Sequence, residues 1–311
     1  MKIVIAIGGN MISDASKPNE PFDQQLLRVQ ETAKILVSIV KLGHHIVITH
    51  GNGPQVGSLL LQQESNVDGA VKLPLNVLGA MTQGQIGIML QHALINEFRS
   101  QGLSEDVYII PTTVLVDSSD PGFQNPTKPI GPFYSKEVFS TMKQNGTNYV
   151  ELSKGFRRVV PSPDPKIIME GDVISDLIDQ GKVVIAVGGG GSPTIKTEDG
   201  KLKRVDAVID KDLASAVLAD QLDADMLLVL TNVDGVYKNY GAEDQHIIPL
   251  ITNSDAVQML ETTELGAGSM HPKVKAAVRF TSNKNGRKAG ISTAEYAIQT
   301  ISGDAGTIIT S

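Results

Sequence analysis

The chain has 311 residues, a formal net charge of −7 and a pI of about 5.4; 41% of its residues are hydrophobic and only 4% are aromatic. Nucleic-acid-binding proteins usually carry a basic surface, so this acidic balance argues against one. The absence of cysteine excludes disulfides and cysteine-ligated metals, and it fits a reducing compartment. Without an apolar run of about 18 residues or a signal-peptide pattern, we expect a cytoplasmic protein with no membrane span.

Short aliphatic runs alternate with helical patterns along the chain. In chain order we expect a strand at 2–7, a helix over 24–43, a strand at 45–50, helices around 54–65 and 81–101, a strand within 107–116, and strands at 182–187, 225–233 and 306–310. Two more helices are expected to start near Lys211 and Lys273. The strands are continuous aliphatic runs, which is typical of strands covered on both faces. The pattern therefore predicts an α/β fold with a mostly parallel sheet and helices on both sides.

Residues 117 to about 165 interrupt this alternation. The segment holds prolines at 121, 126, 129, 132, 161, 163 and 165. Proline lacks the N–H group that a central strand needs, so the segment is predicted to protrude as a small subdomain. A surface insertion without function is the alternative, but ordered proline-rich loops are often functional, and this one carries Lys128.

Glycine-rich turns follow several of the predicted strands. They are Gly8-Gly9-Asn10, Gly51-Asn52-Gly53, 188–191 and 266–269. Glycine lets backbone N–H groups face a ligand, and parallel sheets bind ligands at the carboxyl ends of their strands. The dinucleotide-like spacing of 51–57 is a weak signal because it follows the second strand, and no Walker A motif is present. Each loop alone is equally consistent with a tight turn, but together they favour a pair of polyanionic substrates.

Two lysines lie at predicted helix starts, where the helix dipole does not favour a cation. Lys211 stands between Asp210 and Asp212, and Lys273 follows Pro272. Each lysine makes more sense opposite an anion, with an aspartate orienting it, although surface charge is the alternative for both.

No strong general base is evident in the sequence. None of the six histidines stands in a zinc-binding spacing, and no Gly-x-Ser-x-Gly motif is present. Phosphoryl transfer to a carboxylate needs no such base because the nucleophile is already an anion. It needs positive charge and in-line positioning. The sequence is therefore consistent with a kinase that phosphorylates an acid.

These segments resemble the carbamate kinases of the amino-acid kinase superfamily almost from end to end. The motifs are IGGN (7–10), THGNGPQVG (49–57), GAMTQG (79–84), NPTKPIGPFY (125–134), RRVVPSPDP (157–165), VIDKDLAS (208–215) and GSMHPKVKAA (268–277). The glycine loops and the last lysine motif also occur in acetylglutamate, glutamate and aspartate kinases. The two proline-rich motifs are more particular to carbamate kinases, so they carry the finer resemblance.

The resemblance implies one domain over residues 1–311, built as a three-layer α/β/α sandwich, and a homodimer. It implies the reversible reaction ATP + carbamate ⇌ ADP + carbamoyl phosphate, with Mg²⁺ on the nucleotide phosphates and no metal ligands from the protein. The N-terminal half would bind carbamate and the phosphoryl group, residues from about 117 to 165 would form a lid, and about 207–311 would bind the nucleotide. Such enzymes often run towards ATP in arginine or related catabolism.

The resemblance also assigns residues to three groups. The cradle for carbamate and the transferred phosphoryl group would be Gly8, Gly9, Asn10, Gly51, Asn52 and Gly53. The catalytic group would be Lys211 and Lys273, with Asp212 holding them in place and Lys128 reaching over from the lid. The nucleotide would contact Asp234, Tyr237, Lys238, Gly268, Ser269 and Met270. Related kinases have a lysine at the position of Ala6, so Lys211 or Lys128 would supply that charge.

The chain departs from the usual carbamate kinase pattern at a few positions. Leu78 and Thr82 replace the cysteine and serine of CGAMSQG, and Ser192 and Thr194 flank Pro193 in place of an apolar pair. The second departure leaves open an altered substrate or a modest rate.

Two other functions stay open. One is a superfamily kinase acting on a larger carboxylate, and the other is a nucleotide-binding regulator without activity. A larger acid would need an arginine, but Arg28 and Arg99, the only arginines among the first hundred residues, are expected on helix surfaces. The four proposed catalytic residues are all present, which argues against an inactive regulator.

Overall fold

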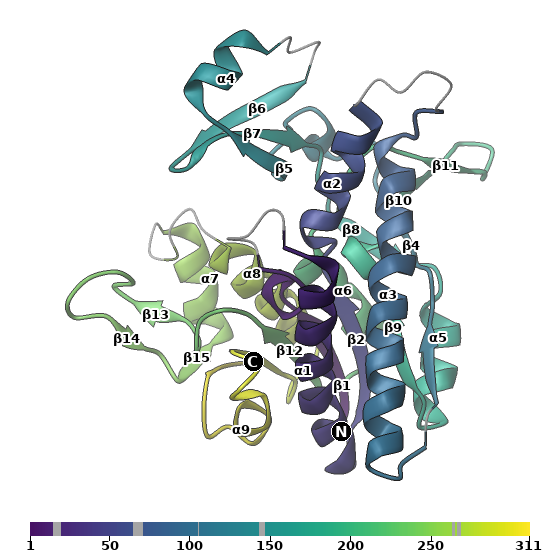
Figure 1. Ribbon diagram of the computed structural model, residues 1–311. Helices are drawn as coiled ribbons and strands as arrows, with labels where there is room; N and C mark the ends of the chain where they lie inside the picture. The colour runs from purple at the N-terminus through teal and green to yellow at the C-terminus, as the bar shows by residue number, and fades with distance from the viewer. Residues whose placement is uncertain (15–19, 65–70, 105, 143–146, 263–264, 266–268) are drawn as a thin grey trace.

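The central element of the fold is an eight-stranded sheet (Figure 1). The computed structural model describes residues 1–14, 20–64, 71–104, 106–142, 147–262, 265 and 269–311. From edge to edge the strands are β15 (Leu250–Thr252), β17 (Thr307–Thr310), β16 (Lys288–Ser292), β12 (Met226–Leu230), β1 (Lys2–Ile7), β2 (His45–His50), β9 (Val183–Ala186) and β3 (Val107–Ile109). Neighbouring strands pair in parallel except β16 and β17, which are antiparallel. The prediction of a mainly parallel sheet is confirmed.

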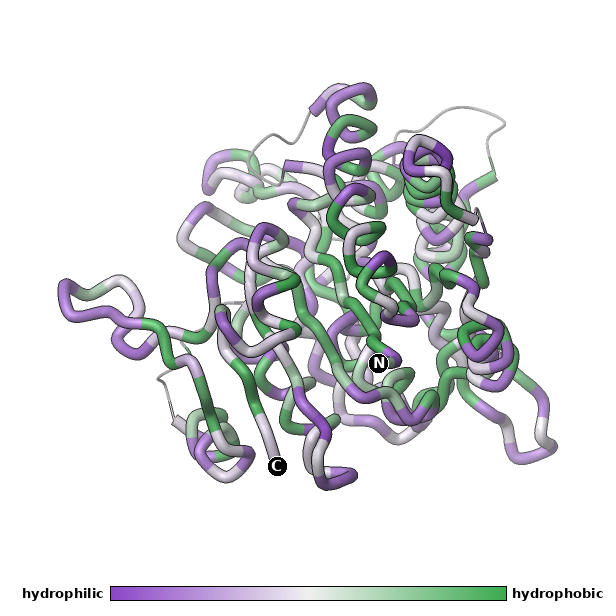
Figure 2. Tube along the Cα trace, turned by 90° about the horizontal axis from the view of Figure 1, so that it is seen from below, coloured by the Kyte–Doolittle hydropathy of each residue, from purple (hydrophilic) through white to green (hydrophobic). Residues whose placement is uncertain are grey.

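Helices cover both faces of this sheet because its strands are apolar on both sides. In β1, Ile3, Ile5 and Ile7 pack into one core cluster, whereas Val4 and Ala6 pack into the other. The first cluster lies under α1 (Phe22–Lys41), α3 (Leu75–Ser100) and α9 (Ala297–Ser302), and the second under α5 (Gly171–Asp179), α6 (Lys211–Gln221), α7 (Asn253–Glu261) and α8 (Met270–Ser282). Figure 2 shows apolar residues along the inner segments and polar ones along the outer loops. The three-layer α/β/α arrangement is therefore confirmed.

Three smaller sheets complete the fold. The first has the order β11 (Leu202–Arg204), β10 (Ser192–Lys196), β4 (Thr113–Val116) and β8 (Pro165–Ile168). The second pairs β13 (Tyr237–Lys238) with β14 (His246–Ile247). The third is an antiparallel sheet of β5 (Lys128–Tyr134), β7 (Gly155–Val160) and β6 (Asn148–Leu152), joined by α4 (Lys136–Thr141). We call residues 128–142 and 147–160 the lid; they stand apart from the main sheet in Figure 1.

The lid has a small aromatic core of its own and rests on α2 (Gly53–Glu64). Within the lid, Phe139 stacks on Phe156 with ring centroids 4.0 Å apart. Towards α2, Ile130 packs in one apolar cluster with Val56 and Val160. The proline-rich segment therefore holds an ordered unit that is fastened to the helix following the second glycine loop.

Several sequence predictions of the elements were wrong or incomplete. Within the main sheet the predicted strands lacked β15 and β16, because three residues, or a run such as KAGIS with a central glycine, give too short an apolar signal. Of the strands in the three smaller sheets, only β4 had been predicted. The region 107–116 holds two strands, β3 and β4, which belong to different sheets. The helix expected at 81 begins at Leu75, and α5, α7 and α9 were not predicted. Within the described ranges, no helix is long and apolar enough to cross a membrane.

We expect the contact between α2 and the lid to tolerate no side chain at Gly57. A Cβ atom there would lie 2.8 Å from the Gly131 Cα of β5, which is backbone and cannot rotate away. Gly57→Ala should therefore lower the free energy of unfolding by about 1–3 kcal/mol, measured by urea denaturation. The matched control is Gly79→Ala in α3, where a Cβ would meet no atom within 4 Å. It should stabilise by up to about 1 kcal/mol because alanine favours helix. Equal effects of the two changes would contradict this packing.

Candidate active site

Two of the predicted glycine loops start side by side. Ile7 pairs with His50 across β1 and β2, so Gly8 and Gly51 leave the sheet at the same edge. A Cβ at Gly8 would come within 2.9 Å of the Leu230 carbonyl oxygen of β12, so that glycine allows close packing. A Cβ at Gly9 would meet nothing within 4 Å, so the space beside it is open. The two loops thus form one edge whose backbone is accessible to a small ligand.

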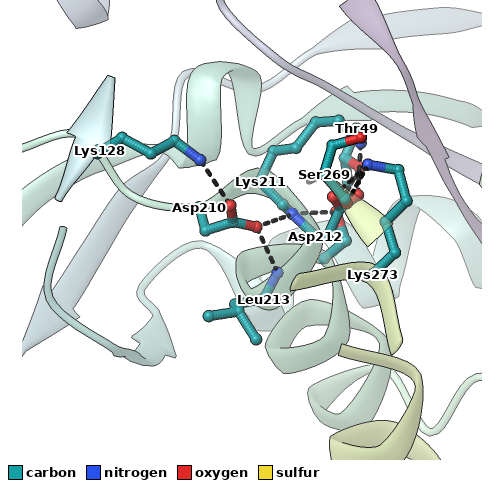
Figure 3. Close-up of polar contacts among 9 residues, drawn as sticks. Thr49, Lys128, Asp210, Lys211, Asp212, Leu213, Ser269 and Lys273 are labelled. Atoms are coloured by element: carbon teal, nitrogen blue, oxygen red, sulfur yellow. Dashed lines mark hydrogen bonds and ion pairs between the residues drawn. The ribbon is translucent and has the colours of Figure 1, made fainter. Parts of the chain in front are cut away.

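A buried carboxylate joins the two predicted lysines (Figure 3). Lys211 Nζ lies 2.5 Å from Asp212 Oδ1, and Lys273 Nζ lies 3.5 Å from Asp212 Oδ2. Asp212 is 3% exposed and Lys273 is 6% exposed, so both charges need a partner. Burial lowers the pKa of Lys273, and the neighbouring Asp212 carboxylate opposes that shift. One aspartate therefore holds two ammonium groups at the starts of α6 and α8.

The Lys211 side chain connects this pair to the glycine edge. A Cβ at Gly51 would lie 3.4 Å from Lys211 Cδ, so the side chain runs directly past that loop. Two hydroxyl groups connect the start of α6 to β2. Ser215 Oγ donates to the Lys211 carbonyl oxygen at 2.6 Å and lies 2.6 Å from Thr49 Oγ1. Thr49 is on β2, so a strand that ends in a glycine loop also positions the start of α6.

Asp210, which is absent from the predicted site residues, links the start of α6 to the lid. Its Oδ1 accepts hydrogen bonds from the backbone N–H groups of Asp212 (2.9 Å) and Leu213 (3.4 Å), which caps α6. Its Oδ2 lies 2.5 Å from Lys128 Nζ of the lid. Burial alone would raise the pKa of Asp210, but the Lys128 ammonium and the hydrogen bonds lower it to about 2. The signal available in the sequence was an aspartate directly before a helix, which is typical of a cap.

The third glycine loop, η3 (Gly188–Gly190) with Gly191, packs between two segments of the site. Gly189, Gly190 and Gly191 have positive φ angles. A Cβ at Gly189 would lie 3.0 Å from Asn52, and one at Gly190 would lie 2.5 Å from the Ile209 carbonyl oxygen. The loop is thus wedged between the second glycine loop and the residue before Asp210. Its glycines let these parts of the chain approach each other.

The proposed nucleotide residues lie in two places. Asp234 and Tyr237 are joined by a side-chain hydrogen bond and precede or open β13, next to the exposed Lys238. Ser269 and Met270 lie at the start of α8, where the Ser269 carbonyl oxygen accepts a 3.0 Å hydrogen bond from Lys273 Nζ. Gly268 lies outside the described residues. The structure thus brings Ser269 to the lysine cluster, and the nucleotide role of the whole set stays a prediction.

Three residues that depart from the usual family pattern, Leu78, Thr82 and Ser192, contact their neighbours in the fold. Leu78 is fully buried in the cluster under the lid, and Thr82 Oγ1 donates to the Gly79 carbonyl oxygen at 2.6 Å. Ser192 Oγ accepts a 3.1 Å hydrogen bond from Gln83 Nε2. The buried Gln83 also bonds both backbone groups of Thr112. The bond between Gln83 and Ser192 therefore helps to fasten α3 to β10.

The carboxylates of the site are paired with lysines. Among the described residues, no group of three or more His, Cys, Asp and Glu side chains could hold a metal ion. Asp210 and Asp212 already accept from lysines. Mg²⁺ is usually held by one or two carboxylates, water and substrate phosphates. The donor set therefore fits a metal that arrives on a polyphosphate.

Comparisons with known proteins give a consistent result. A model of the amino acid kinase family matches residues 1–291. The chain is 45% identical to a carbamate kinase of Thermococcus kodakarensis over 98% of both chains. A solved carbamate kinase of Giardia lamblia bound to citric acid has a TM-score of 0.92 and 37% identity, covering 99% of this chain and 98% of that chain. The Giardia enzyme bound to AMP-PNP has a TM-score of 0.90 and 39% identity, with the same coverage.

His50 at the end of β2 should make folding sensitive to acid. Its complete burial lowers its pKa to about 4, below the ordinary value of 6.5, and its Nδ1 donates to the Gly51 carbonyl oxygen at 2.8 Å. The unfolded chain therefore binds a proton more readily than the folded one between these values. Stability from His50 is complete above pH 6.5, and about 3 kcal/mol is lost as the pH falls to 4.

His50→Asn removes the titrating ring from this position. We expect the difference in unfolding free energy between wild type and variant to shrink by about 3 kcal/mol between pH 7 and pH 4. Urea denaturation at several pH values measures it, with His246→Asn on an exposed hairpin as the control. Parallel curves for wild type and His50→Asn would contradict the assignment.

Proposed function

The chain belongs to the amino acid kinase family and groups within it with the carbamate kinases, and we propose that it transfers a phosphoryl group reversibly between ATP and carbamate. The observation that carries this proposal is the pair of lysines on the Asp212 carboxylate, next to an open glycine edge. The glycines Gly8, Gly9, Gly51 and Gly53, with Asn10 and Asn52, would cradle the carbamate and the transferred group. Lys211 and Lys273 would neutralise its charge, and Lys128 would approach it from the lid.

The chemistry needs no proton transfer. In the direction of ATP synthesis, an oxygen of the ADP β-phosphate attacks the phosphorus of carbamoyl phosphate. The bond from phosphorus to the acyl oxygen breaks, and carbamate leaves as an anion. In the transition state, negative charge is spread over the three oxygens of the transferred group and increases on the leaving carbamate oxygen. Preorganised ammonium groups stabilise this charge best in a site with little water. The burial of Lys273 and the fixing of Lys211 by Asp212 support this role.

A small acid fits the site better than a large one. A larger carboxylate would need a free arginine near the N-terminal glycine loops. Arg28 Nε lies 2.8 Å from Glu20 Oε1, and its Nη2 lies 3.2 Å from Asp14 Oδ2, so two carboxylates already engage it. Arg99 is exposed at the last turn of α3. These engagements favour carbamate over an acid with a second carboxylate.

The nucleotide and the metal follow from the same chemistry. We propose that ATP or ADP contacts Asp234, Tyr237, Lys238 and the start of α8 around Gly268, Ser269 and Met270. The AMP-PNP bound to the Giardia enzyme supports a nucleotide of this class. Mg²⁺ on the nucleotide phosphates would neutralise their charge when bound, which agrees with carboxylates that are already paired.

The direction of flux and the assembly are also part of the proposal. Carbamoyl phosphate is a mixed anhydride with high transfer potential, so we propose that the reaction runs towards ATP in arginine or related catabolism. A homodimer and a cytoplasmic location follow from the resemblance to carbamate kinases. Size measurement in solution tests the first of these.

The test of the function is ATP formation from ADP, Mg²⁺ and carbamoyl phosphate. We expect fast ATP formation with carbamoyl phosphate and much slower formation with acetyl phosphate. In the reverse direction, ADP release should depend on carbamate and not on acetylglutamate or aspartate. Activity with one of the larger acids would favour another kinase of the superfamily. ADP binding with no transfer to any acid would favour a regulator.

Lys211→Ala should lower kcat by at least about 100-fold, roughly 3 kcal/mol of transition-state stabilisation, because it removes an ammonium group beside the proposed transferred phosphoryl group. The fold should survive, since Asp212 keeps Lys273 as a partner. Lys201→Ala is the control, because Lys201 is exposed and pairs with an exposed aspartate. The ATP-formation assay measures both, with melting temperature as the check of folding. Near-normal turnover of the Lys211 variant would remove this lysine from the mechanism.

A further inference from the structure

A polar cavity lies between α1, α2 and α3, next to the second glycine loop. Its volume is about 330 Å³, and its wall on α2 includes Pro54, Gln55, Ser58 and Leu59. Gln25 of α1 and Gln85 of α3 also line it. The lining residues that the structure describes include no lysine or arginine. Glu20 lines it as well, so the cavity offers amides, hydroxyls and a carboxylate and suits the hydrogen-bond donor of a ligand better than its anionic group.

A chain of hydrogen bonds fixes the orientation of two amides in this wall. Gln25 Nε2 donates to the backbone carbonyl oxygen of Glu20 at 3.2 Å. A carbonyl oxygen can only accept, so the NH₂ group of Gln25 must face it and Gln25 Oε1 must face away. Gln55 Nε2 donates to that Oε1 at 3.0 Å. The remaining atom of the Gln55 amide, Oε1, is therefore an acceptor that points elsewhere.

Gln55 Oε1 is buried and has no hydrogen-bond partner in the described part of the chain. The residue is only 5% exposed. Its Oε1 lies over Gly53, so close that a Cβ there would be 2.4 Å away. A buried acceptor without a partner is destabilising, so a donor at this position would be bound favourably. The unpaired oxygen thus lies over the last glycine of the proposed carbamate cradle.

We propose that Gln55 Oε1 accepts a hydrogen bond from the amino group of carbamate and of carbamoyl phosphate, and so selects the substrate. This inference rests on the function proposed above and adds a specificity-determining residue to it. Acetyl phosphate has a methyl group in place of that amino group and would leave the oxygen unpaired. Sites built around a hydrogen bond reject the analogue that lacks it, because the buried polar group then has no partner.

The test uses the full chain with ADP, Mg²⁺ and either acyl phosphate. Gln55→Met keeps the side-chain length and removes the acceptor. We expect kcat/KM for carbamoyl phosphate to fall about 10- to 100-fold. For acetyl phosphate, kcat/KM as a substrate and the inhibition constant as a competitive inhibitor should change less than about threefold, because acetyl phosphate makes no such bond. Gln85→Met, an exposed residue of the same cavity, is the matched control and should leave both values unchanged.

A second variant keeps the test decisive if Gln55→Met folds poorly. Gln25→Met leaves Gln55 in place but removes the partner that orients its amide. Gln25→Met should lower kcat/KM for carbamoyl phosphate by a smaller factor than Gln55→Met and leave kcat/KM for acetyl phosphate unchanged. Equal losses for both acyl phosphates, or no change in selectivity, would overturn the inference. A wild-type protein that makes no ATP from carbamoyl phosphate would instead overturn the proposed function itself.

Discussion

The site depends on one buried carboxylate that holds two ammonium groups. Lys211 and Lys273 lie at the starts of two helices, where the backbone N–H groups already carry positive charge. Two more positive charges there would repel each other, and burial adds a desolvation cost. Asp212 offsets both, because each of its oxygens faces one lysine. One carboxylate between two ammonium groups leaves a formal positive charge, which the proposed phosphoryl transfer would use.

The lid is coupled to this centre through a second aspartate. Asp210 caps α6 and holds Lys128, so the helix start and the lid share one side chain. The lid also rests on α2, which begins in the second glycine loop. If Lys128 acts on the transferred group, it must leave Asp210 or share it with substrate. Lid position and substrate binding would then be linked by exchange of an ion-pair partner.

The glycines of the site have two different physical roles. Beside Gly9 the structure leaves open space, which suits a ligand next to the backbone. In the loop at 188–191 the glycines let neighbouring parts of the chain pack closely, against Asn52 and the Ile209 carbonyl oxygen. Sequence patterns do not distinguish the two, because both appear as a glycine run after a strand. Only the neighbours in space tell which glycines are available to substrate.

The sequence by itself determined the features that depend on near neighbours along the chain. Apolar runs predicted the inner strands, proline density marked the segment that contains the lid, and motifs identified the family. The sequence did not predict short strands such as β15 and β16, because their pairing with β17 stabilises them more than their own residues do.

Only the tertiary structure decided which charges meet. Lys128, Asp210 and Lys273 are distant in sequence, and sheet order together with helix packing brings them to one edge. The orientation of the Gln55 amide likewise follows from a carbonyl group thirty-five positions earlier, through Gln25. Such relations depend on distances in space, which local patterns along a chain do not encode.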